Sequence, residues 1–241
     1  MKKLILFSML FYFSCKSSQR IEVAEPESIK HWLTIEKLPC FGHCQIYQLS
    51  IYRNGLAILE GKDHMDKKGV YFTEINNSRM EKLMRLEKYI KWQSIKSEYI
   101  VNIADLPMTK LKYYDKFGAL VKSIEANANL PEELNSFVKE ASGIIEKEKW
   151  TQIQKKNEMN NPEIIFDELI VDMDSTININ DLEVSFQNYD LKTINRISPL
   201  MNLWLVKFNP DKIGKYEILT TLRKKQGIRH VSFNRRVLPR E

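Results

Sequence analysis

Two cysteines four residues apart, with a histidine between them, are the residues of this chain best placed to do chemistry. The stretch Cys40-Phe41-Gly42-His43-Cys44 admits a disulfide, a metal site that uses His43, or a redox-active thiol pair. Structural zinc needs four ligands with paired spacing, and a redox pair usually has two residues between its cysteines. In an exported protein, an even pair predicts a disulfide. Its Cα atoms must lie within about 7 Å, so the loop has to turn, and we expect a positive φ at Gly42.

The remaining sequence contains no familiar catalytic, phosphate-binding or metal-binding motif. There is no nucleophile elbow, phosphate loop, His-Glu-x-x-His or Asp-rich calcium loop, so we expect no catalytic residue, metal ion or cofactor. His31 and His64 are the nearest additional ligands for a metal at His43. Several tyrosines on predicted strands either line a binding face or pack between strands: Tyr47, Tyr52, Tyr71, Tyr113 and Tyr114.

The start of the chain predicts export. Residues 1–14 have a basic start followed by an apolar run too short to span a bilayer, which is the layout of a signal peptide. Ser14-Cys15 resembles the lipobox of bacterial lipoproteins, although Tyr12 stands where leucine is usual. The resemblance implies a lipid on Cys15, with residues 15–28 as the lipidated cysteine and a flexible tether. A thiol discarded with an ordinary signal peptide is the alternative. We expect an exported protein, lipid-anchored to a bacterial membrane, with the outer membrane favoured.

The rest of the chain predicts an α+β protein of two small domains. Residues 29–148 contain hairpin signals at Arg53-Asn54-Gly55 and at 115–118, a helix capped by Ser78 and a helix that begins at Pro131. The expected order is β-β-β-α-β-β-α, an antiparallel sheet with helices on one face. A polar linker is expected at 149–162. Residues 163–241 predict a ferredoxin-like β-α-β-β-α-β domain, with its second helix at 212–225.

Three short motifs carry a family resemblance in the first domain. Leu38 to Tyr47, then Tyr52-Arg53-Asn54-Gly55 with Glu60-Gly61, and later Asp105-Leu106-Pro107, are similar to a family of uncharacterised bacterial domains. Those domains occur in exported proteins and lipoproteins, and they share a Pro-Cys-Phe-Gly-x-Cys start. The resemblance covers residues 30–147. It implies a fold for this segment but no reaction.

The last third of the chain resembles the propeptide-like domains of subtilisin-type proteases. A strand at 204–208, a helix ending in Leu222-x-x-x-x-Gly227 and a strand ending at Asn234 follow the same order. The resemblance implies that the tail could lie in the cleft of a protease. Its contact residues would be Arg235, Arg236, Val237, Leu238 and Arg240.

The distribution of charge limits the kinds of partner that the protein is expected to bind. The formal net charge of +6 is too small to predict nucleic-acid binding. Residues 162–190 contain eight acidic side chains and no Lys or Arg, whereas residues 207–241 contain ten basic and three acidic ones. Either the two segments attract each other, or the basic one binds an acidic partner or anionic headgroups.

Together these features favour a membrane-anchored envelope lipoprotein that binds another protein without catalysis. A protease inhibitor that acts through its C-terminal tail is the alternative. An enzyme of unfamiliar type is a third hypothesis, and it would need a concave site with perturbed titratable groups.

Overall fold

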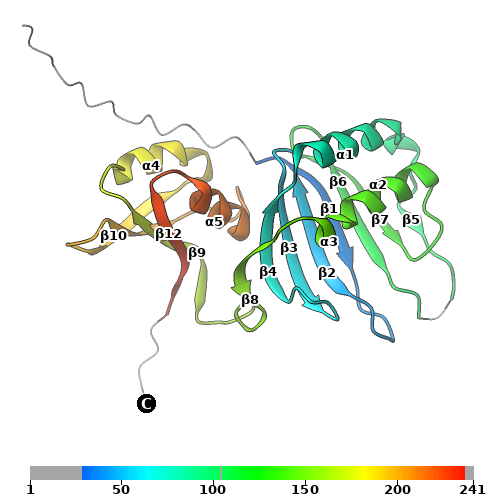
Figure 1. Cartoon of the computed structure of the whole chain (residues 1–241), viewed down its shortest axis with the longest axis horizontal. Helices are drawn as coiled ribbons and strands as arrows, with labels where there is room; N and C mark the ends of the chain where they lie inside the picture. Colours follow the sequence, from blue (N-terminus) through cyan, green and yellow to red (C-terminus); the bar gives the residue numbers. More distant parts are fainter. Residues whose placement is uncertain (1–28, 104, 237–241) are drawn as a thin grey trace, which may run out of the picture.

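The computed structural model describes residues 29–103 and 105–236, which form two packed α+β domains (Figure 1). The first domain has an eight-stranded sheet in the order β5-β7-β6-β1-β2-β3-β4-β8. Its neighbouring strands are antiparallel except for β5 and β7. The strands are β1 (His31–Lys37), β2 (Ile46–Tyr52), β3 (Leu56–Asp63), β4 (Gly69–Glu74), β5 (Glu98–Tyr99), β6 (Thr109–Tyr114), β7 (Leu120–Ala126) and β8 (Thr151–Lys155).

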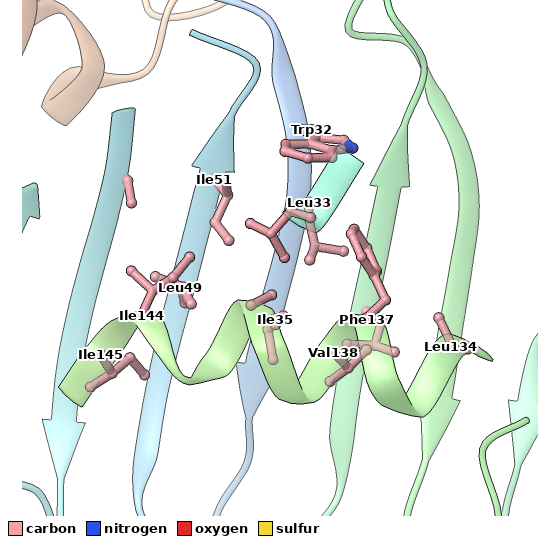
Figure 2. Close-up of a cluster of buried hydrophobic side chains, with 14 of the residues drawn as sticks. Trp32, Leu33, Ile35, Leu49, Ile51, Leu134, Phe137, Val138, Ile144 and Ile145 are labelled. Atoms are coloured by element: carbon pink, nitrogen blue, oxygen red, sulfur yellow. The ribbon is translucent and has the colours of Figure 1, made fainter. Parts of the chain in front are cut away.

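Helices cover one face of this sheet, as expected. They are α1 (Asn77–Tyr89), α2 (Glu132–Ser142) and α3 (Ile144–Lys147), with a 3-10 turn at Trp92–Ser94. Figure 2 shows α2 and α3 lying across the strands, with Phe137 and Ile144 directed at Leu33, Ile35 and Leu49. Alternate strand residues supply this core because successive side chains of a strand point to opposite faces.

The second domain has the predicted ferredoxin-like order. Its elements are β9 (Ile164–Met173), α4 (Ile179–Ser185), β10 (Lys192–Ser198), β11 (Leu203–Lys207), α5 (Lys215–Lys224) and β12 (Ile228–Arg235), with 3-10 turns at Lys156–Glu158 and Gln187–Tyr189. The sheet order β10-β11-β9-β12 is antiparallel throughout, so β11 lies between the two strands that α4 connects. The predicted α+β fold of two domains is confirmed.

Three local expectations differ from the structure. Four strands precede α1, not three, and α1 is capped by the Asn76 side chain, which accepts from the Arg79 backbone N–H, and not by Ser78. Part of the expected linker forms β8, an edge strand paired with β4. Its sequence, Thr-Gln-Ile-Gln-Lys, is too polar to signal a strand. The strand is nevertheless partly buried, because Gln154 is enclosed and hydrogen-bonded on both sides.

A half-buried carboxylate ties α1 to the sheet. Glu87 accepts hydrogen bonds from Trp32 Nε1 (2.9 Å), the Tyr113 hydroxyl (2.7 Å) and two nitrogens of Arg53 (2.8 and 3.1 Å). The Arg53 guanidinium also lies 4.8 Å from the centre of the Trp32 ring. Burial acts to raise the pKa of Glu87, but the hydrogen bonds from Arg53, Tyr113 and Trp32 lower it overall. The carboxylate therefore stays charged and holds β1, β6 and α1 together.

Helix α5 joins the two domains. Its Tyr216 packs in a buried cluster with residues from the sheet face that α1 to α3 leave uncovered: Tyr52, Leu56, Ile58 and Val70. The Tyr216 hydroxyl donates to Gln154 Oε1 (2.7 Å), and the Tyr52 hydroxyl donates to the Glu217 carboxylate. Burial and the neighbouring Glu217 charge raise the pKa of Tyr52 well above its usual value, so this donor keeps its proton.

Ion pairs connect the acidic and basic segments of the second domain. This bears out the expectation that these two segments attract each other. Each pair has at least one solvent-exposed partner, so each stabilises the fold only weakly. The pairs are Asp167–Lys207 (3.0 Å), Asp190–Lys212 (2.8 Å) and Asp172–Arg229.

At position 61 there is no room for a side chain, so only glycine fits without a clash. A Cβ atom there would lie 1.7 Å from the Lys67 carbonyl oxygen, because the β3–β4 connection folds back over the strand. We expect Gly61→Ala to lower the free energy of unfolding by about 3 kcal/mol or more, since backbone would have to move. Urea denaturation followed by circular dichroism measures the loss.

Gly42→Ala is the matched control for this substitution. Its Cβ atom would meet nothing closer than Cys40 Sγ at 3.9 Å, so we expect a change within about 0.5 kcal/mol. Equal stability losses for the two variants would contradict the steric argument.

Candidate binding surface

The edge strand β10 presents apolar side chains to solvent. Its pairing with β11 shifts register between Thr193 and Asn195 and again between Arg196 and Ser198. Ile194 and Ile197 are therefore the extra residues of two β-bulges, and both are exposed. A bulge re-aims a side chain away from the normal alternation of a strand. These two bulges keep both isoleucines out of the second-domain core.

The turn after β10 extends this apolar strip. Leu200 is 93% exposed and Met201 is also exposed. Beside them lies a hollow of about 470 Å³, lined by the 175–179 loop and by Arg196, Asn202 and Trp204. We call the four exposed apolar residues and this hollow the hairpin surface. Exposed apolar patches beside polar residues are typical of protein interaction sites.

Hydrogen bonds preorganise the floor of the hairpin surface. Asn202 Nδ2 donates to the carbonyls of Asp174 (2.7 Å) and Ile177 (3.0 Å), while its Oδ1 accepts from Trp204 Nε1 (2.7 Å). One amide thus holds both the loop before α4 and the indole ring. Arg196 donates to the Met201 carbonyl (3.2 and 3.3 Å) and lies 5.5 Å from the Trp204 ring centre.

This arrangement suits binding. A half-buried Trp and an Arg, fixed by their neighbours and surrounded by exposed aliphatic residues, have the composition of an interface hot spot. A partner that covers the strip would meet side chains already held in place, so it would lose little additional conformational entropy on binding.

The disulfide predicted in the first domain is present. Cys40 and Cys44 are bonded with their Cα atoms 6.0 Å apart, so neither thiolate is available as a metal ligand. The loop turns without a positive φ at Gly42, contrary to our expectation. His43 lies beside His64, with ring centres 5.1 Å apart. In the described part of the chain, no group of three or more His, Cys, Asp or Glu side chains is arranged to hold a metal ion.

The predicted tail contacts are only partly visible. Arg235 ends β12 and forms an ion pair with Glu158, and the Arg236 backbone N–H donates to the Glu163 carbonyl (2.8 Å). Val237, Leu238 and Arg240 lie outside the described residues, as does Cys15. No helix between residues 29 and 236, leaving out residue 104, is long and apolar enough to cross a membrane.

Sequence reasoning overlooked the hairpin surface, although a signal was present. Leu191, Ile194 and Ile197 are spaced by three, whereas a half-buried strand has a period of two. Leu191 is buried and the two isoleucines are exposed. A period of three within a strand indicates bulges, and apolar bulge residues are candidates for contact with a partner.

The fold defines a two-domain α+β protein whose second domain carries this exposed apolar surface. Residues 31–145 match the model of a family described as a domain of unknown function, DUF6438. The match extends from β1 into α3, so it contains the disulfide, Gly61 and the Glu87 network, and it ends before β8 and the second domain. The chain matches no curated protein and no solved structure.

Asn202→Ala tests whether this amide organises the hairpin surface. We expect a loss of about 1–3 kcal/mol, because two partly buried carbonyls and the indole N–H lose their partner. Urea denaturation measures the loss, and a shift in tryptophan emission reports that Trp204 has moved. Asn195→Ala is the matched control, since that exposed amide bonds only the neighbouring Arg196 carbonyl. Equal effects of the two changes would show that Asn202 does not organise this surface.

Proposed function

We propose that the protein is a membrane-anchored envelope lipoprotein that binds a partner protein, without catalysis, through the hairpin surface. The observation that carries this proposal is the strip of four exposed apolar residues beside a hollow whose Trp204 and Arg196 are already held in place. Anchoring through Cys15 is supported by the sequence at the end of the apolar run.

The position of the hairpin surface fits this role. Figure 1 shows β10 at the outer edge of the second domain, on the side away from the first sheet. A partner could approach this edge without disturbing the α5 joint. The bulges also break the regular edge of β10, and this disfavours edge-to-edge aggregation while leaving the side chains available.

A photo-crosslinking residue in place of Leu200 tests the proposal in native cells. We expect one discrete adduct with another envelope protein, because this position lies at the centre of the exposed strip. The matched control carries the same crosslinker in place of Tyr89, which is 73% exposed on α1 of the other domain. Adding Ile197→Asp should abolish the Leu200 adduct without changing the melting temperature. Equal adducts at the two positions, or none at Leu200, would refute the hairpin surface as the binding site.

A protease inhibitor is the second candidate. It is supported by the ferredoxin-like order of the second domain and by Arg235 and Arg236, which attach the root of the tail to the rest of the chain. If the tail acts in a protease cleft, the full chain should inhibit a subtilisin-type protease, and removal of residues 237–241 should abolish inhibition. Activity assays on a peptide substrate measure this. Equal inhibition by both forms, or none by either, would exclude a mechanism through the tail.

A further inference from the structure

A second hollow lies between the two domains and is separate from the hairpin surface. It has a volume of about 400 Å³ and is lined by residues 29–31, Tyr52, Tyr114 and the β6–β7 turn of the first domain, and by Tyr189, residues 210–214 and Glu217 of the second. The two hollows share no lining residue. Sites for small ligands are common at domain interfaces, and this volume is at the lower end of their range.

Flat rings form one wall of the interdomain hollow. His31 stacks on Tyr114 with ring centres 4.4 Å apart and planes at 23°, and it also contacts Tyr52 at 4.7 Å. Phe117 lies on the β6–β7 turn and is 70% exposed, with the Lys116 ammonium 4.9 Å from the centre of its ring. Packing explains why Tyr52 is aromatic, but it does not explain an aromatic ring at position 117. An exposed ring beside a hollow is available for contact with a ligand.

The polar groups of the hollow are held in fixed positions. The Glu217 carboxylate accepts from the Tyr52 hydroxyl, and Gly214 leaves room for it, since a Cβ there would lie 2.1 Å from a Glu217 oxygen. His31 Nε2 is 2.9 Å from the Thr34 hydroxyl. Burial, with a smaller contribution from Lys112, lowers the pKa of His31 to about 4, so its imidazole is neutral at pH 7.

The hollow has no net formal charge. Its lining contains two cations, Lys30 and Lys212, and two carboxylates, Asp211 and Glu217, while His31 is neutral. An ionic ligand would find no excess of the opposite charge. A neutral ligand with an apolar face and several hydroxyl groups would match both the rings and the fixed hydrogen-bonding groups. Sugar rings have this character, because their C–H groups form an apolar face and their hydroxyls lie around the edge.

We propose that the interdomain hollow binds a neutral sugar unit of a glycan, which stacks on the Phe117 side and is hydrogen-bonded by groups on the Glu217 side. This goes beyond the protein-binding role proposed for the hairpin surface. The volume accommodates one or two sugar rings. Because the lining comes from both domains, the site depends on the α5 joint.

Titration calorimetry with two neutral trisaccharides, chitotriose and maltotriose, tests this proposal. The protein is the full chain, purified in a detergent without a sugar headgroup. We expect at least one trisaccharide to bind with a Kd of about 1 mM or below, and Phe117→Ala to weaken binding about tenfold or more. Phe117→Tyr should retain binding because it keeps the ring. Tyr89→Ala removes an exposed aromatic ring elsewhere and should change nothing.

Three outcomes would overturn the proposal. The first is no heat of binding from either trisaccharide up to about 10 mM. The second is binding that survives Phe117→Ala unchanged. The third is preferential binding of an acidic sugar, tested with a trigalacturonate probe, which would mean that the ligand is an anion. Thermal unfolding of each variant shows whether a loss of binding reflects misfolding, and Phe117 is exposed enough that we expect no change in melting temperature.

Discussion

Helix α5 packs against two sheets at once, and the organisation of the molecule depends on this double contact. Ile218, Leu219 and Leu222 belong to the core of the second domain, while Tyr216 inserts into a cluster on the first sheet. Tyrosine suits this position, since its ring is buried with apolar neighbours and its hydroxyl reaches Gln154. The Tyr52–Glu217 hydrogen bond adds a polar contact beside it. Through α5, two small domains become one packed body.

The joint also determines what remains accessible. It covers the β2, β3 and β4 portion of the sheet face that α1 to α3 leave open, and at its margin lies the interdomain hollow. It faces away from β10, so the hairpin surface stays free (Figure 1). The two candidate sites therefore differ in kind. One is a small neutral hollow that exists only when both domains are docked, and the other is a larger apolar strip that the second domain forms by itself.

Local structure explains two of the motifs on which the family resemblance of the first domain rests. The cysteine pair closes a short loop before β2, and Arg53 of the Tyr-Arg-Asn-Gly turn reaches Glu87 on α1. Gly61 is required because the β3–β4 connection crosses it closely. These two motifs therefore have structural roles, and residues 31–145 match a family whose description names no activity. This is why the functional proposals rest on surfaces and not on these motifs, although Tyr52 also lines the interdomain hollow.

The sequence by itself determined the α+β class, the ferredoxin-like order, the disulfide and the presence of α5, because periodicity, turn residues and cysteine spacing are local properties. The sequence could not reveal β8. Its polar residues form a strand only because the fold brings β4 and the hydrogen-bonding partners of Gln154 close to it. The sequence predicted a helix at 212–225, but only the tertiary structure decided that its Tyr216 packs against the other domain. The bulges of β10 and the neutral interdomain hollow likewise depend on pairing and docking between residues distant in the chain. No local pattern encodes such contacts.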